Sequence, residues 1–173
     1  MERLQNIQGD WQATKEYAHP KLALIAWVVL ILGLGSGMVI FFGPDSWFQT
    51  LSKPTWNPPA WVFAPAWTLL YTLMGISVWW VRRDTSASRS EKSLAMRLFW
   101  IQFVLNLAWT PIFFGLHQPG LAFIEICLLW LAALWAALAF GKISSAAGYL
   151  LVPYQAWLSF ALVLNGTIWL LNK

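Results

Sequence analysis

The sequence predicts an all-α integral membrane protein built as a bundle of five transmembrane helices. Three observations predict it: an apolar composition, five long apolar stretches, and charged residues that lie almost entirely between those stretches. Of the 173 residues, 59% are hydrophobic and 10% are charged, whereas soluble domains carry about 25% charged residues. A soluble chain with so few charges would leave its surface uncovered, so lipid is the expected surroundings of a single domain.

Each predicted helix is long enough to cross a bilayer core, which takes roughly 20 apolar residues. The five predicted helices cover residues 22–42, 59–81, 94–116, 119–140 and 146–171. Pro59 and Pro119 stand at predicted helix starts, where the missing N–H of proline removes no hydrogen bond. The short link through His117 and Gln118 makes the third and fourth helices antiparallel neighbours. Residues 1–20 are predicted to form an N-terminal tail, disordered or lying on the membrane surface, ahead of the transmembrane domain 21–173.

Basic residues are distributed unequally between the two sides of the predicted bundle. The side opposite the N-terminus carries only Lys53 and Lys173. The N-terminal side carries Arg3, Lys15, Lys21, Arg82, Arg83, Arg89, Lys92, Arg97 and Lys142. The positive-inside rule then places the N-terminus in the cytoplasm, with a bacterial cell membrane as the favoured host. The net charge of +4 is therefore a topology signal, and no nucleic-acid partner is expected because no basic patch is evident.

Tryptophan is the unusual residue type, with 14 in the chain. Four lie near predicted helix ends, where indole rings favour the headgroup region: Trp61, Trp79, Trp80 and Trp169. Five lie deeper: Trp67, Trp109, Trp130, Trp135 and Trp157. An unpaired indole N–H in lipid is costly, so a deep tryptophan either donates to another helix or lines a cavity.

Three deep tryptophans have companions at helical spacing. Trp67 and Tyr71 share one face of the second helix, and Trp157 stands four residues before Ala161 on the fifth. On the third helix, Asn106 stands three residues before Trp109. Helix packing explains each pair alone. Three such pairs on three helices favour a pocket, since an apolar cleft with a few polar groups is the usual small-ligand site.

Two further features of the spans bear on a cavity. Pro65, Pro111 and Pro153 fall inside predicted helices, where they are expected to bend the chain and open space between helices. Glu125 is the acidic residue inside a span, and it either contacts a ligand or hydrogen-bonds a neighbouring helix.

Catalytic and metal-site signals are weak. No HExxH, phosphate loop or acidic pair is present, so no catalytic residue, metal site or obligatory cofactor is predicted. His117 is expected to be solvated, with haem-iron ligation from the interface as the alternative. Gly33 and Gly37 form a GxxxG pair that fits close packing within one chain or between two copies of it.

Three sequence blocks carry a family resemblance. The first is Lys53-Pro54-x-Trp56-x-Pro58-Pro59, within WFQTLSKPTWNPPAWVFAPAWTLLY at 47–71. The others are LNLAWTPIFFGLHQPGLAFIE at 105–125 and LLVPYQAWLSFALVLN at 150–165. Together they resemble the translocator protein family, also called tryptophan-rich sensory proteins, over about residues 22–173. The resemblance implies a five-helix bundle, often a homodimer, that binds protoporphyrin or haem-type tetrapyrroles, aromatic drugs and, in some members, sterols.

The resemblance also implies which residues form the pocket, with the connection between the first two helices as its cap. Carried onto matching positions, they are Trp47, Phe48, Trp67, Asn106, Trp109, Trp157 and Ala161; helical spacing adds Tyr71. Phe48 replaces a tyrosine of some members, which weakens a photochemical role. Gly166 and Leu170 stand where sterol-binding relatives have tyrosine and arginine, which argues against sterol binding.

The function expected from these residues is tetrapyrrole binding inside the membrane, as a stress sensor, regulator or carrier. Protoporphyrin IX or haem is expected as a ligand, and membrane lipid as the other partner. Photo-oxidative degradation of a bound porphyrin and porphyrin or sterol transport are the alternatives.

Overall fold

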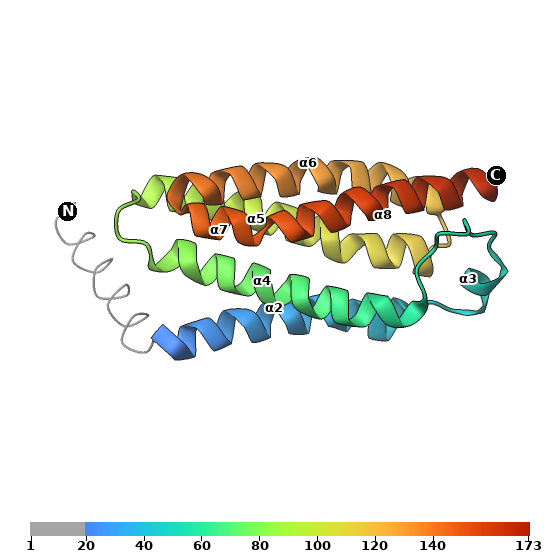
Figure 1. Cartoon of the computed structure of the whole chain (residues 1–173), viewed down its shortest axis with the longest axis horizontal. Coiled ribbons are helices and arrows are strands. Elements are labelled where there is room, and N and C mark those ends of the chain that lie inside the picture. Colours follow the sequence, from blue (N-terminus) through green and yellow to red (C-terminus); the bar gives the residue numbers. More distant parts are fainter. Residues whose placement is uncertain (1–19) are drawn as a thin grey trace.

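The computed structural model describes residues 20–173, and they form a five-span helical bundle (Figure 1). The predicted tail lies outside the described residues except for Pro20, at which the first helix begins. The segments long and apolar enough to cross a membrane are Pro20–Phe42, Ala60–Arg83, Arg89–Gly115, Pro119–Ile143 and Ser145–Leu171. No strand occurs within residues 20–173. The predicted fold class is confirmed.

The elements in chain order are α2 (Pro20–Phe42), α3 (Ser46–Thr50), the 3₁₀ turn η1 (Ala60–Val62), α4 (Phe63–Arg83), α5 (Arg89–Thr110), the π-helical turn η2 (Pro111–Gly115), α6 (Pro119–Ile143), α7 (Ser145–Leu150) and α8 (Val152–Leu171). Residues 43–59 form the long connection between α2 and η1, and α3 lies within it. We call this connection the lid, because α3 lies at one end of the bundle (Figure 1).

The third span begins earlier than predicted, at Arg89 instead of residue 94. Ser88 caps α5: its side chain accepts from the Glu91 N–H, while the Glu91 carboxylate accepts from the Ser88 N–H. This reciprocal cap satisfies N–H groups that a helix start leaves unpaired. Charge had assigned residues 89–93 to a loop, but charged residues are equally suited to the end of a helix at the membrane surface.

The fifth span is two helices instead of one. It breaks at Leu151, between α7 and α8, and Pro153 follows in the first turn of α8. Pro111 likewise coincides with a change of helix type, because η2 begins there. Pro65 differs, since it is the third residue of α4, where its missing N–H interrupts no helical hydrogen bond. Pro65 was predicted to bend its helix by removing a backbone hydrogen bond, and this reason does not apply at the first turn.

The bundle consists of two groups of helices. α2 packs along α4, and α6 packs between α5 and α8, while α7 links α4 to α6 (Figure 1). Gly75 lets α2 approach α4, because a Cβ there would lie 2.6 Å from the Val28 Cα. Gly33 and Gly37 have no such neighbour within 4 Å, so in the described residues the GxxxG pair does not mediate packing inside the chain.

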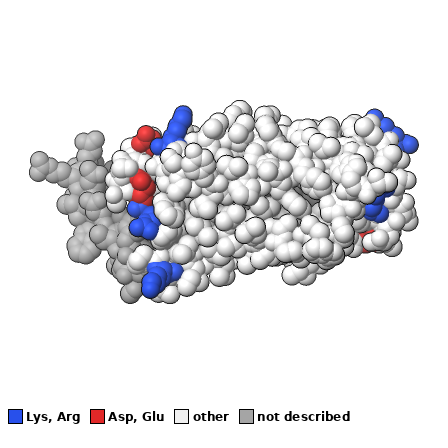
Figure 2. Space-filling view, viewed as in Figure 1, with Lys and Arg blue, Asp and Glu red and all other residues white. Residues whose placement is uncertain are grey.

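Charged side chains mark the two ends of this long bundle. On the face drawn in Figure 2, Lys, Arg, Asp and Glu gather at the ends and leave an uncharged middle. Large apolar side chains are exposed on the spans; Ile40 is 80% exposed and Trp135 is 58% exposed. Such a surface fits hydrocarbon, and it identifies Trp135 as a deep tryptophan that faces outward.

Candidate functional site

An aromatic cluster fills the space between α4 and α8. We call Trp67, Tyr71, Tyr154 and Trp157 the inner cluster. The Trp67 ring stacks on Tyr71 with centroids 5.0 Å apart and meets the edge of Trp157 at 6.2 Å and Tyr154 at 6.4 Å. Three predicted site residues from two helices thus lie in contact.

A chain of buried hydrogen bonds supports the inner cluster from α5. The Tyr71 hydroxyl donates to Asn106 Oδ1 at 2.9 Å, and Asn106 Nδ2 donates to the Tyr154 hydroxyl at 3.1 Å. That hydroxyl donates in turn to Gln102 Oε1 at 3.0 Å. Asn106, predicted to line the pocket, therefore holds two tyrosines in place through one acceptor site of Oδ1 and one N–H of Nδ2.

A groove opens beside the inner cluster, between α4 and α8. Its volume is about 410 Å³. Its lining is Ala66, Leu69, Leu70, Pro153, Ala156, Trp157 and Phe160. Every one of these side chains is apolar, and Leu69 is 56% exposed, so the groove faces the hydrocarbon. Of the eight predicted site residues, Trp157 alone lines it.

A second aromatic cluster lies under the lid. We call Trp47, Phe48, Trp109, Phe113 and Phe114 the lid cluster. Trp109 stacks on Phe113 at 4.9 Å, and Trp47 and Phe48 meet the edge of Phe113 at 5.9 and 6.1 Å. The structure therefore divides the predicted site: Trp47, Phe48 and Trp109 gather here, apart from Trp67 and Tyr71.

Phe63 and Phe160 bridge the two clusters. Their rings lie 5.8 and 5.6 Å from the Trp157 ring, and both pack against the buried residues beneath the lid. Ala161 is half-buried on α8 and packs against the main core. The lid cluster and inner cluster are thus continuous through phenylalanine side chains.

The deep indole N–H groups fall into two classes. Trp109 donates to Asn165 Oδ1 at 3.0 Å, and Trp130 donates to Ser159 Oγ at 2.8 Å, so another helix accepts both protons, as one of the two alternatives predicted. Within residues 20–173, the indole N–H groups of Trp67, Trp135 and Trp157 donate to no acceptor of the protein. Trp135 faces outward, whereas Trp157 lines the groove and Trp67 contacts Trp157.

Sequence reasoning missed two residues of the site. Tyr154 and Gln102 join the hydrogen-bond chain around Asn106, but neither was predicted to contribute. Helical spacing contained the signal: Tyr154 stands three residues before Trp157, and Gln102 stands four before Asn106.

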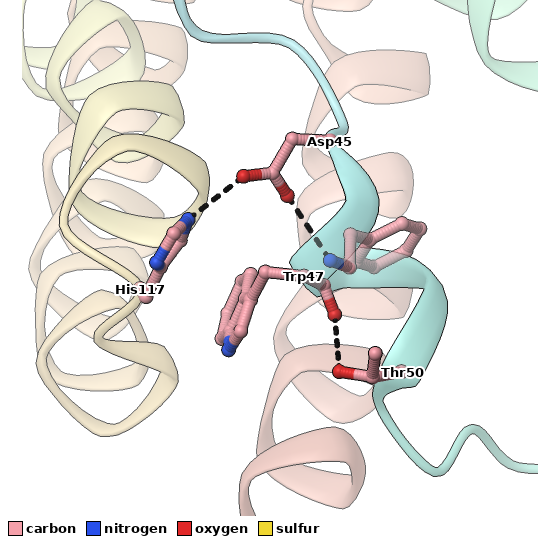
Figure 3. A network of polar contacts seen from close by, with 5 residues as sticks. Asp45, Trp47, Thr50 and His117 are labelled. Atoms are coloured by element: carbon pink, nitrogen blue, oxygen red, sulfur yellow. Dashed lines mark hydrogen bonds and ion pairs between the residues drawn. The ribbon is translucent and has the colours of Figure 1, made fainter.

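Two polar contacts fasten the lid to the bundle. His117 Nε2 lies 3.0 Å from Asp45 Oδ2, and the His117 ring stacks on Trp47 at 4.2 Å (Figure 3). Further along, the Ser52 N–H donates to Asn172 Oδ1, and Asn172 Nδ2 donates to the Ser52 carbonyl, both at 2.9 Å. His117 is exposed, as predicted for a solvated histidine, but it also has a carboxylate partner.

Glu125 is buried on α6, with a relative exposure of 7%. Neither of its carboxylate oxygens has a hydrogen-bond partner among the described residues. The prediction that it bonds to a neighbouring helix is therefore wrong for residues 20–173. Glu125 interacts electrostatically with Tyr154 of the inner cluster, so it belongs to the surroundings of the site.

Fold and site together define a multi-pass helical membrane protein with an aromatic interior capped by a lid. The sequence profile of the TspO/MBR family matches residues 24–170. The chain belongs to this family, as its three motif blocks predicted.

Named relatives agree with this assignment. The tryptophan-rich protein TspO of Chlorobaculum tepidum is 42% identical over 152 residues, which cover 87% of this chain and 95% of the relative. Protein CrtK of Rhodobacter capsulatus is 39% identical over 76% of this chain and 81% of its own length. The human translocator protein is 38% identical over 71% and 73%. The family is thus an integral membrane one with bacterial and animal members.

Proposed function

We propose that this protein binds a flat tetrapyrrole, of the protoporphyrin or haem type, between α4 and α8, and acts as a sensor, regulator or carrier. The observation that carries the proposal is the pair Trp67 and Trp157, whose rings meet between the helices while their N–H groups find no acceptor within residues 20–173. A ligand with aromatic faces and acidic substituents offers what this pair lacks: a surface for stacking and an acceptor for the indole protons.

The groove supplies the apolar part of the interaction. It is open toward lipid and has apolar walls, so a ligand dissolved in the bilayer reaches it without crossing a polar surface. A whole porphyrin needs more room than the groove alone, so binding includes separation of the Trp67 and Trp157 rings. Aromatic contacts of this kind are weak individually, at roughly 0.5–1.5 kcal/mol beyond area burial. New stacking contacts with the ligand can therefore offset the loss of the contact between the two rings.

A titration with protoporphyrin IX, followed by quenching of tryptophan fluorescence in lipid nanodiscs, tests the proposal. Trp67→Phe and Trp157→Phe keep a ring but remove the donor, so each is expected to weaken binding about tenfold, the effect of one hydrogen bond of about 1.4 kcal/mol. Trp135→Phe is the matched control, because Trp135 faces outward. Equal affinity for the wild type and both cluster variants would refute the proposed site.

One observation favours a second function, photo-oxidative degradation of the bound porphyrin. Trp67, Tyr71 and Trp157 are oxidisable rings in mutual contact. They would donate an electron to the excited ligand, which would pass it to dissolved dioxygen, the oxidant that then attacks the porphyrin ring. Illumination of the complex should then yield a distinct product whose formation depends on Trp67. Simple bleaching at equal rates in wild type and Trp67→Phe would leave binding as the function.

The membrane orientation also enters as a proposal. Among the described residues, the lid end carries Lys53 and Lys173, whereas Lys21, Arg82, Arg83, Arg89, Lys92 and Lys142 lie toward the other end. We place the latter end in the cytoplasm of a bacterial host, by the positive-inside rule. The variant Ser52→Cys, which places a cysteine in the lid, should then react with a thiol reagent added outside intact cells.

A further inference from the structure

The lid is held to the bundle at two places that differ in chemistry. One contact joins Asp45 to His117 in the connection between η2 and α6, and it contains two ionisable groups. The other joins Ser52 to Asn172 just beyond α8, and it contains none. A change of pH therefore acts on one contact and leaves the other as it is.

The Asp45 side chain is held in place by a backbone N–H of the lid. As N-cap of α3, its Oδ1 accepts from the Phe48 N–H at 3.1 Å, while Oδ2 faces His117 (Figure 3). The Phe48 N–H, and then His117, hold the pKa of Asp45 below its ordinary value. Asp45 is therefore ionised throughout the neutral range, so the imidazole is the group of this contact whose proton decides the charge of the pair.

His117 is held in place from the other side. Its φ of 55° lies in the left-handed region, which asparagine, aspartate and histidine tolerate better than other non-glycine residues. Its ring stacks on Trp47 with an interplanar angle of 22°. The side chain is 41% exposed, so water can deliver and remove its proton.

Few other charges lie near this contact. Of the four acidic side chains in residues 20–173, Asp84 and Glu91 are at the opposite end and Glu125 is buried within α6, which leaves Asp45 at the lid end. The cations there are Lys53 and Lys173, which lie over the rings of Phe48 and Trp169 at 4.4 and 4.3 Å. Asp45 is thus the anion within contact distance of His117.

We propose that Asp45 and His117 form a proton-operated latch that controls opening of the lid. When His117 carries a proton, it attracts the Asp45 carboxylate and, as a cation, the face of Trp47. When His117 is neutral, a hydrogen bond from its ring N–H to the carboxylate and the ring stacking remain, but the attraction between opposite charges is lost. The closed lid is therefore favoured when His117 is protonated, and opening becomes easier once His117 has lost that proton.

The latch is tested without any ligand by hydrogen exchange of the amides in α3, using the full chain in lipid nanodiscs. Exchange is compared at about pH 5.5 and about pH 8, on either side of the histidine range, after correction for intrinsic exchange rates. We expect the opening equilibrium of the wild type to rise about two- to fivefold, the size of effect that a half-exposed ion pair supports.

Two variants isolate the charges while they preserve the local structure. Asp45→Asn keeps an N-cap acceptor for the Phe48 N–H, and His117→Asn tolerates the left-handed conformation. His117→Asn is expected to lose the pH dependence, and Asp45→Asn to lose most of it, because a protonated His117 would still attract the Trp47 ring. Asn172→Ala should increase opening at both pH values and leave their ratio unchanged. Asp84→Asn changes a partly buried acid that accepts backbone N–H groups at the opposite end, and it should behave as the wild type.

The outcome that overturns the latch is a pH ratio near one in the wild type, or an unchanged ratio in Asp45→Asn or His117→Asn. A ligand measurement then connects the latch to the proposed function. Only this measurement rests on the proposed function; the hydrogen-exchange test does not. Protoporphyrin IX should dissociate faster at the higher pH from the wild type, but at equal rates from His117→Asn. If protoporphyrin does not bind at all, the proposed function fails while the exchange result still decides the latch.

Discussion

The two sides of α4 are packed in opposite ways. Toward α2, Gly75 brings the backbones together, and Gly35 lets the Tyr71 ring lie against α2, where an added Cβ would be 2.3 Å from that ring. Toward α8, the helices are kept apart by the rings of Trp67 and Trp157, and a groove remains beside them. The same helix thus forms a close backbone contact on one side and an adjustable aromatic contact on the other.

This difference shows where the bundle can change. A contact between backbones cannot widen without loss of packing on both helices, because interiors are close-packed. Side chains that meet edge to face across a groove can rotate into space that already exists. We therefore expect the α2–α4 pair to be the fixed part of the site, and α8 to be the part that adapts to a ligand.

The largest effect is expected from breaking the close contact with Gly75→Ala. The new methyl group would overlap the Val28 backbone, so the helices must separate. We expect a loss of about 3 kcal/mol, the upper part of the range for overpacking, measured by thermal or SDS-induced unfolding. Gly33→Ala is the control, since its methyl group meets nothing and Ala is the better helix former. Equal stability of the two variants would contradict the close contact between α2 and α4 at Gly75.

A smaller effect separates the two classes of indole. Trp109→Phe removes the donor to Asn165 Oδ1, whereas Trp157→Phe loses no hydrogen bond within the described residues. Both remove the same volume, so the first variant should be less stable than the second by about 1 kcal/mol, one net hydrogen bond. The unfolding midpoints of the two proteins provide the measurement. A larger loss for Trp157→Phe would mean that its N–H already has an acceptor.

The smallest effect is expected on the groove side, from Ala156→Leu. Ala156 is exposed and lines the groove, so a longer side chain fills open space. Stability should change by less than about 0.5 kcal/mol, while protoporphyrin affinity should fall because the groove is occupied. Unfolding and fluorescence titration of the same sample measure both. A destabilised protein would show that the groove is closed in the membrane.

Much of this architecture follows from the sequence, because lipid imposes simple rules on it. Span number and length follow from apolar runs, and helical spacing correctly joined Trp67 to Tyr71. Spacing did not show that Trp109 would find Asn165, since the two residues are 56 positions apart and pair only after α5 and α8 meet. Spacing also did not show that the Asn106 side chain would be hydrogen-bonded to two tyrosine hydroxyls. Contacts between distant helices depend on tilt and rotation, which apolar periodicity does not specify.

The break at Leu151 determines how the aromatic site is bounded. α7 is anchored to α4, because the Ser77 hydroxyl donates to the Ala147 carbonyl at 2.7 Å, and to α6, where Gly148 approaches Gly141. Past the break, α8 continues along α6 and the groove begins at Pro153. The width of the groove is thus set by a joint near one end of the span, so substitutions at that joint can change the width without altering any aromatic ring of the inner cluster.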